Sequence, residues 1–261
     1  MSSIVTTERR GSHLIATMDD PSTRNAMTEG LLSGLEAVFD QAEADPDLHS
    51  LVLTGANGAF CAGADLKSVG STENIGGRDP AWVSNHRGGQ FFARLNALPV
   101  CVIALVDGPA MGGGFGMSCC ADIVLATARA KFALSETSLG LIPAQIAPYV
   151  VGRLGLKQAR KLALTGEMLT GQRAVDVGLV DITAGTTEDL QAPLADLLNK
   201  IRRCGPRANG VTKRLLQSLA PTPAAFIGAA ADAFTGALRG PEGQEGVSAF
   251  IEKRKARWTE S

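Results

Sequence analysis

The chain has 261 residues, of which 45% are apolar and 20% are charged. This composition excludes a disordered chain, and the length allows one large domain or two small ones. Lys and Arg number 25 against 26 Asp and Glu, so the net charge of -1 excludes the strong basic field typical of nucleic-acid-binding proteins. The longest uncharged apolar run, residues 98–106, is too short to cross a membrane. The N-terminal segment carries charge and lacks the apolar stretch of a secretory signal.

The cysteines indicate a reducing compartment. Their number is odd, no CxxC pair occurs, and the adjacent Cys119 and Cys120 are poor partners for a disulfide. We therefore expect small buried cysteine side chains and a cytoplasmic protein. The three histidines show no metal-binding spacing, so we expect no metal site.

Strands alternate with helices in the first part of the chain. Residues 14–18 and 51–54 are typical of buried strands, and Thr28 can cap a helix whose apolar positions run from Leu31 to Ala42. Asp45-Pro46-Asp47 ends that helix. Residues 67–80 are polar and rich in glycine, which predicts a mobile surface loop.

The later part of the chain becomes increasingly helical. An apolar helical face from Phe91 to Leu98 precedes a β-branched, uncharged stretch at 100–106, which is typical of a strand covered on both sides. The further predicted strands are 123–126 and 131–134, and the further predicted helices are 171–177, 189–201, 206–219, 223–238 and 242–258. This order predicts an α/β core over residues 1–200 and a helical C-terminal region over 201–261.

Common nucleotide-binding and hydrolase motifs are missing. The glycine cluster at 112–116 does not fit GxGxxG, because Cys119 stands where the third glycine belongs. Neither a P-loop nor a GxSxG sequence occurs. A nicotinamide or nucleoside triphosphate enzyme is therefore not supported.

Two glycine-containing turns each follow a buried apolar strand, at Ala59–Leu66 and at Asp107–Gly114. Glycine lets backbone N–H groups approach a ligand, and two such groups aimed at one point form an oxyanion hole. The plainer interpretation is a pair of tight turns, and composition alone favours it, because such turns are common.

Four sequence blocks together carry a resemblance: FCAGADL, DGPAMGGGFG, ADIVLATARAKFALSETSLGLIP and EGVSAFIEKRKARW. In this order they resemble the enoyl-CoA hydratase/isomerase (crotonase) superfamily, from Arg24 to the C-terminus. The resemblance implies an α/β fold, a spiral of β-β-α turns with a helical C-terminal region for assembly into homotrimers or hexamers. It also implies an acyl-CoA substrate, with coenzyme A entering as part of that substrate and no metal or redox cofactor.

The resemblance assigns roles to individual positions. The backbone N–H groups of Ala64 and Gly113 would hold the thioester oxygen. The predicted coenzyme A contacts of the subunit itself are Arg24, Ala26, Ala62, Asp65 and Leu66. Phe250 and Lys253 match positions that reach the coenzyme A of a neighbouring subunit, although Lys253 also fits a solvated helix face.

The carboxylates distinguish between reactions within the superfamily. Hydratases with two carboxylates carry one Glu two residues after the GGG block, where this chain has Gly116, and a second at the position of Glu136. Glu136 would lie over C2 and C3 of the acyl chain in an apolar pocket, which raises a carboxyl pKa toward the range useful for proton transfer. A single Glu is compatible with a hydratase and with an isomerase.

The segments 135–144 and 147–151 resemble a subgroup, the methylglutaconyl- and isohexenylglutaconyl-CoA hydratases, which also have Gly at the first position. We therefore expect a hydratase of a branched, carboxylated enoyl-CoA, with Gly116 leaving room for the β-branch. Arg78, Arg87 and Arg94 are candidate partners for the distal carboxylate, although ordinary surface arginines are the simpler interpretation. The alternatives are an isomerase that moves a 3-double bond to position 2 and a coenzyme A-binding protein with little catalysis.

Overall fold

A computed structural model describes residues 4–65, 76–219 and 226–259. Leu66 and most of the loop predicted over 67–80 lie outside these residues. Among the described helices, none is long and apolar enough to span a membrane.

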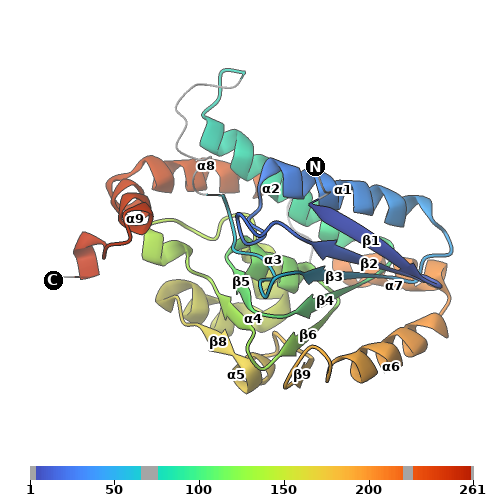
Figure 1. Ribbon diagram of the computed structural model, residues 1–261. Coiled ribbons are helices and arrows are strands. Elements are labelled where there is room, and N and C mark those ends of the chain that lie inside the picture. Colours follow the sequence, from blue (N-terminus) through green and yellow to red (C-terminus); the bar gives the residue numbers. More distant parts are fainter. Residues whose placement is uncertain (1–3, 66–75, 220–225, 260–261) are drawn as a thin grey trace.

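The main sheet has six strands in the order β1-β2-β3-β4-β6-β9 (Figure 1). β1 is antiparallel to β2, and the other neighbours are parallel. The strands are β1 (Val5–Arg10), β2 (His13–Met18), β3 (Ser50–Gly55), β4 (Cys101–Val106), β6 (Ile123–Thr127) and β9 (Ile182–Ala184). The strand predicted at 100–106 is thus central, as its uncharged sequence requires.

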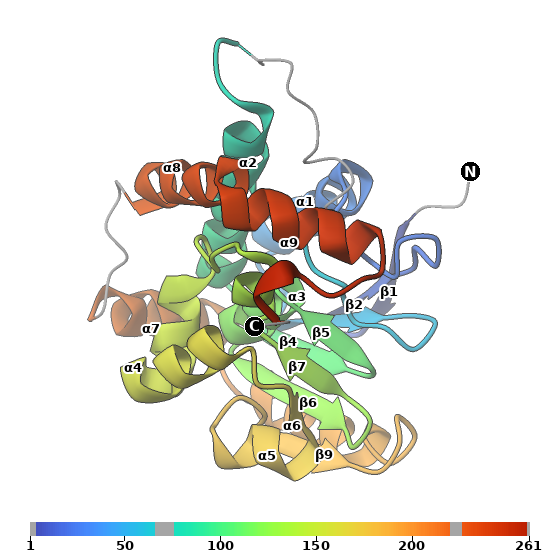
Figure 2. The same ribbon diagram turned by 90° about the vertical axis from the view of Figure 1, so that its left-hand side faces the viewer.

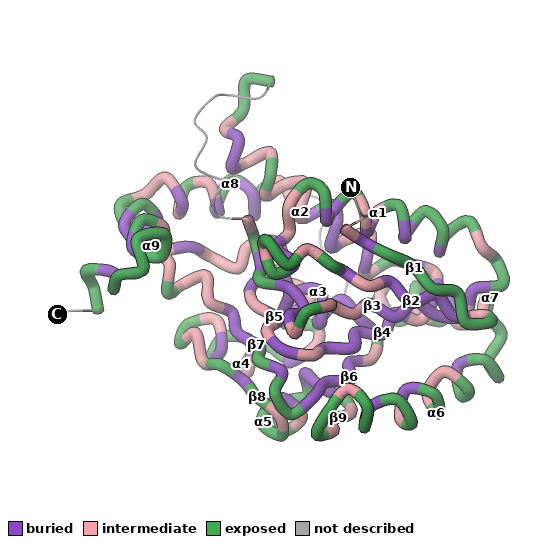
Figure 3. The backbone as a smooth tube through the Cα atoms, in the orientation of Figure 1, coloured by how far each residue is buried: buried purple, intermediate pink, exposed green. Residues whose placement is uncertain are grey.

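Both faces of this sheet are covered, because alternate side chains of a strand point to opposite sides. Leu51 and Leu53 of β3 face the larger apolar cluster, which includes side chains of α1 (Glu29–Ala44) and α2 (Pro80–Ala97). Val52, between them, faces a second cluster that is closed by α6 (Gln191–Arg202). Figure 3 shows the buried sheet between exposed outer helix faces.

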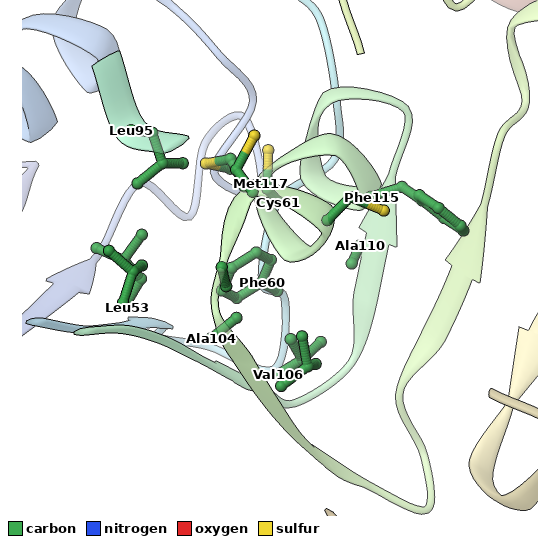
Figure 4. Packing of buried hydrophobic residues seen from close by; sticks show 14 of the residues in the cluster. Leu53, Phe60, Cys61, Leu95, Ala104, Val106, Ala110, Phe115 and Met117 are labelled. Carbon is green, nitrogen blue, oxygen red and sulfur yellow. The ribbon is translucent and has the colours of Figure 1, made fainter. Parts of the chain in front are cut away.

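A second, smaller sheet gives the chain its spiral course. Its strands are β5 (Pro109–Met111), β7 (Lys131–Ala133) and β8 (Leu169–Thr170), and single bridges join Cys61 to Ala110 and Met27 to Ala64. The chain passes from the main sheet to the small sheet and then into a helix, as in β4, β5 and α3 (Gly113–Cys120). Figure 4 shows α3 packed through Phe115 and Met117 on the side chains at this crossing. The predicted spiral of β-β-α turns is confirmed.

The remaining elements are η2 (Glu136–Leu139), α4 (Ala147–Thr165), α5 (Gly171–Asp176), α7 (Pro206–Ser218), α8 (Phe226–Arg239), α9 (Pro241–Ile251) and η3 (Arg257–Thr259). α8 packs along α2, and α9 packs on η2 (Figure 2). The helical C-terminal region is therefore present. Its role in assembly and the division of the chain at residue 200 stay predictions.

The helix predicted over 242–258 is too long, since α9 ends at Ile251. Lys253 adopts a left-handed conformation with φ 56°, and the N–H of Arg254 donates back to the carbonyl of Ala249 at 2.9 Å. The buried Glu245 accepts hydrogen bonds from the guanidinium of Arg254 at 2.7 Å and from the N–H of Arg257 at 2.9 Å. These contacts lower the pKa of Glu245 to about 2, so a charged clamp rather than a helix holds this segment.

Candidate active site

Three stretches of backbone meet where α3 begins. The N–H of Met27 donates to the carbonyl of Gly63 at 2.8 Å, and the N–H of Met111 donates to the carbonyl of Cys61 at 2.9 Å. A Cβ on Gly63 would lie 2.9 Å from the carbonyl oxygen of Met111 and 3.7 Å from the nitrogen of Gly113. Residue 63 therefore has to be glycine for this loop to lie against the start of α3.

Two backbone N–H groups at this junction have no partner in the described part of the chain. Within the described residues, neither the N–H of Ala64 nor that of Gly113 donates a hydrogen bond. Gly113 opens α3, and the first N–H groups of a helix have no acceptor inside it. The helix dipole adds positive potential there, so the junction can bind an oxygen that gains negative charge.

Glu136 lies beside the same turn, as the first residue of η2. Gly112 precedes α3 with φ 49° and ψ -109°, a conformation that favours glycine, and a Cβ there would lie 3.0 Å from Oε1 of Glu136. The N–H of Gly112 donates to the carbonyl of Ala133 at 3.0 Å, which joins the turn to the end of β7. Glu136 thus lies beside the turn that leads into Gly113, and its predicted catalytic role stays a prediction.

Glu136 is half-buried as a residue, but its Oε2 atom is buried and has no hydrogen-bond partner in the described part of the chain. Burial raises the pKa of Glu136 to about 7, and the N–H of its own residue offsets only part of this rise. A carboxyl group with such a pKa can both accept and release a proton near neutral pH.

Gly116 faces an apolar wall instead of a second carboxylate. A Cβ at this position would lie 3.0 Å from Cβ of Ile146 and 3.1 Å from Cε1 of Phe92, and Cγ2 of Ile146 would lie closer still. The expectation that Gly116 leaves room for a substrate branch is therefore wrong. Ile146, from the segment before α4, and Phe92, from α2, fill the space that the missing side chain vacates.

The predicted coenzyme A contacts lie along two neighbouring segments. Ala26 is buried, and Ala62 is exposed. Arg24 is exposed with φ 58°, and its carbonyl accepts from the N–H of Ala62 at 3.2 Å. Asp65 is half-buried, and Leu66 lies outside the described residues.

Asn25 joins these segments and was not found from the sequence. Its Nδ2 donates to the carbonyl of Ala59 at 2.8 Å, and its Oδ1 accepts from the N–H of Asp20 at 2.7 Å. It adopts a left-handed φ of 58°, which asparagine tolerates better than most residues, so the residue type was the available sequence signal.

The two C-terminal candidates differ from the residues of this junction because their side chains are exposed. Phe250 is 58% exposed near the end of α9, and Lys253 is exposed in the turn that follows. Exposed side chains of this kind are accessible to a neighbouring molecule, but nothing within the chain fixes what they contact.

The three candidate arginines differ in their contacts. Arg87 forms ion pairs with Glu29 at 2.8 Å and with Glu36 at 3.0 Å, so it links α2 to the surface of α1. Arg94 likewise pairs with acidic side chains of α1, Asp40 and Glu43. These two arginines are therefore ordinary surface partners, as the simpler interpretation held.

Arg78 differs from these two arginines because its described contact is with an aromatic ring instead of a carboxylate. Its guanidinium lies 4.1 Å from the ring centre of Trp82, and among the described residues it forms no ion pair.

Sequence reasoning also missed the apolar lining of the site. Met27 and Phe92 lie against Gly113, with Cζ of Phe92 3.6 Å from where a Cβ would stand. Phe92 was predicted only as part of a helical apolar face, and Ile146 belonged to no motif. Both side chains contact glycine positions of α3, and this proximity is visible only in the folded structure.

The comparisons with known proteins agree with this architecture. Residues 8–261 match the family model described as enoyl-CoA hydratase/isomerase. The chain belongs to the enoyl-CoA hydratase/isomerase family.

A solved enoyl-CoA hydratase/isomerase from Marinobacter aquaeolei is 39% identical to this family member, with a TM-score of 0.79 over 98% of this chain and 99% of that one. AtuE from Pseudomonas aeruginosa is 40% identical, with a TM-score of 0.78 over the same shares of the two chains. The 2,3-dehydroadipyl-CoA hydratase of Escherichia coli is 32% identical over 92% of each chain.

Replacing Gly116 by alanine should destabilise the protein. A Gly→Ala change inside a helix usually stabilises by about 0.5–1 kcal/mol, but overpacking against Ile146 costs about 1–3 kcal/mol. We expect a net loss of about 1–2 kcal/mol in the free energy of unfolding, measured by urea denaturation. Gly236→Ala in α8 is the matched control, since its added Cβ meets no described atom within 4 Å beyond its chain neighbours and the backbone of its own helix. Equal stability of Gly116→Ala and wild type would contradict the claim that Ile146 and Phe92 fill the space beside Gly116.

Replacing Glu136 by glutamine should stabilise the protein in a pH-dependent way. The ordinary pKa of 4.5 rises to about 7 on folding, so the cost of burying the charge is absent below pH 4.5, grows through this interval and is complete above pH 7. Thermal unfolding should show a larger gain for Glu136→Gln at pH 8 than at pH 5. An equal gain at both pH values would show that Glu136 is not buried as a charge.

Proposed function

We propose that this family member is an enoyl-CoA hydratase that adds water across the C2–C3 double bond of a 2-enoyl-CoA. The observation that carries the proposal is the position of Glu136, whose buried Oε2 has no partner among the described residues, beside the turn at Gly112. The N–H groups of Ala64 and Gly113, at the same junction, also have no acceptor within those residues. The proposal takes this acid/base group and this site for negative charge to act on the same acyl chain.

The two N–H groups act first. They would hold the thioester oxygen, and their hydrogen bonds strengthen as that oxygen gains enolate charge. Polarisation of the thioester makes C3 electrophilic, so the double bond becomes open to attack by water.

Glu136 moves the proton. Its ionised carboxylate accepts a proton from water while the water oxygen bonds to C3 and the C2–C3 π electrons pass toward the thioester oxygen. The protonated Glu136 then donates this proton to C2, which gives a neutral 3-hydroxyacyl-CoA and restores the carboxylate. A pKa of about 7 suits both halves of this cycle.

Coenzyme A enters as part of the substrate, and the proposed steps use only groups of the chain. The Ala62–Leu66 backbone, Ala26 and Arg24 would contact the coenzyme A of their own subunit. Phe250 and Lys253 would reach that of a neighbour in a homotrimer or hexamer, in keeping with their exposure. The cysteine pattern supports a cytoplasmic enzyme.

The acyl chain is proposed to carry a distal carboxylate, on the subgroup resemblance of segments 135–144 and 147–151. The same resemblance implies a branch on C3, which the wall of Ile146 and Phe92 at Gly116 disfavours. The name of the Escherichia coli relative, a dehydroadipyl-CoA hydratase, supports a distal carboxylate. Arg78 is the candidate cation for it, because Arg87 and Arg94 already serve carboxylates of α1.

An enoyl-CoA isomerase is the second candidate. The apolar wall beside Gly116 favours it, since a single carboxyl can carry a proton between two carbons without binding water. The two functions differ in whether the product contains an added water.

Replacing Glu136 by glutamine should abolish most turnover. General acid–base groups contribute about 10²–10⁴-fold, so we expect kcat for hydration of crotonyl-CoA to fall at least about 100-fold, with KM changed much less. The measurement is the loss of the enoyl thioester absorbance at saturating substrate. A loss under about tenfold would remove Glu136 from the reaction.

Replacing Arg78 by glutamine should separate carboxylated from plain substrates. We expect kcat/KM for glutaconyl-CoA to fall at least about tenfold, because a charge-assisted hydrogen bond is lost, and kcat/KM for crotonyl-CoA to stay within about twofold. Arg94→Gln, which removes a paired surface arginine, is the control. Equal effects on both substrates would refute the role of Arg78.

A further inference from the structure

We propose that Ile146 is a specificity-determining residue that sets the room for a substituent on C3, the β-carbon of the acyl chain. The proposal rests on the proposed function, because it takes the thioester oxygen to lie at Ala64 and Gly113. It assigns to one side chain a role that the sequence motif gave to the space beside Gly116.

The first turn of α3 sets the distance between the proposed oxyanion site at Gly113 and the wall at Gly116. Gly113 and Gly116 are three positions apart and share one side of the helix, about 4.5 Å apart along its axis. C3 of an enoyl thioester lies two bonds beyond the carbon whose oxygen the N–H of Gly113 would hold. The proposal takes the acyl chain to run along α3 from Gly113 toward Gly116, which brings C3 to the side chains that face residue 116.

Phe92 makes the surface continuous. Its Cζ lies 3.6 Å from the Cβ position of Gly113, and its Cε1 lies 3.1 Å from that of Gly116. Ile146 stands next along, with Cβ 3.0 Å from the same point at Gly116. The wall that begins at the oxyanion-binding N–H thus ends on the Ile146 side chain.

Ile146 is firmly held. It is 4% exposed, and its carbonyl accepts from the N–H of Val150 at 3.0 Å at the start of α4. The adjacent Gln145 is also buried, and its Nε2 donates to Oδ1 of Asn85 at 2.8 Å and to the carbonyl of Ile227 at 3.0 Å. Three helices therefore fix the segment, and a β-branched side chain has few alternative rotamers.

Phe92 is less suited to set specificity, because it also supports the core. Its ring lies 5.5 Å from that of Phe91 and 6.3 Å from that of Tyr149, centre to centre. A change at Phe92 would disturb the contact between α2 and α3. A shorter side chain at 146 opens the pocket while leaving that contact in place.

The test compares ligands that differ by one methyl group on C3. Butyryl-CoA and 3-methylbutyryl-CoA are titrated into wild type, Ile146→Val and Ile146→Ala by calorimetry, and kcat/KM is measured for crotonyl-CoA and 3-methylcrotonyl-CoA. One methylene in an apolar pocket changes affinity about 10–200-fold. For affinity and for kcat/KM alike, we expect the value for the branched ligand divided by that for the unbranched ligand to rise. The expected rise is at least about tenfold in Ile146→Ala and at least about threefold in Ile146→Val.

The control is Ile201→Ala. Ile201 is a buried isoleucine, 7% exposed, that packs in the cluster closed by α6 on the other face of the main sheet. It should lower stability without changing the ligand ratio. If Ile146→Ala does not fold, Ile146→Val decides the question through its smaller shift.

The outcomes separate the two proposals. A ratio within about twofold of wild type in the Ile146 variants, or an equal shift in Ile201→Ala, would overturn the role of Ile146 while leaving the proposed function intact. Wild-type binding of both thioesters without hydration would overturn the hydratase, and the binding ratio would still test Ile146. Failure of the wild type to bind either thioester would overturn both.

Discussion

The close approach of three backbone segments at the start of α3 governs the rest of the site. Gly63 lies against Met111, and the carboxyl of Glu136 lies where a side chain on Gly112 would begin. Neither contact tolerates a Cβ without a shift of backbone or carboxylate. Where the segments meet, the N–H groups of Ala64 and Gly113 have no acceptor among the described residues, and we propose that they bind an oxygen of the ligand.

The chemistry of Glu136 follows from the same packing. Its carboxyl is charged only at a cost, because burial removes water from Oε2 and no donor among the described residues replaces it. This unfavourable placement raises its pKa to about 7 and turns an ordinary carboxyl into a proton carrier. Gly116 and its wall of Ile146 and Phe92 then ensure that no second carboxyl enters at that position.

Much of this fold could be predicted from the sequence. The strands at 14–18, 51–54 and 100–106 were evident from uninterrupted apolar runs, and Glu136 and Gly113 were found because motif positions fix them. The short strands β5 and β9 were missed, because three residues carry too little periodicity. The end of α9 was misplaced, because the clamp on Glu245 depends on arginines that a helical pattern also accommodates.

The lining of the site was harder to predict for a different reason. Ile146 and Phe92 are 54 positions apart in the sequence, and the packing of α2 and of the segment before α4 on α3 brings them together at Gly116. An apolar residue next to a glycine gives no signal of its own. The sequence therefore singled out Glu136, whose role stays a proposal, but assigned the space beside Gly116 wrongly.

The most direct test of the account is the mass of the product formed in water enriched in heavy oxygen. The purified enzyme is given crotonyl-CoA, a carboxylated 2-enoyl-CoA and a 3-enoyl-CoA. Addition of water at Glu136 predicts that a 2-enoyl substrate gains one water that carries the heavy isotope. An unlabelled product of unchanged mass, with the double bond of the 3-enoyl substrate moved to position 2, would contradict the hydratase and establish an isomerase.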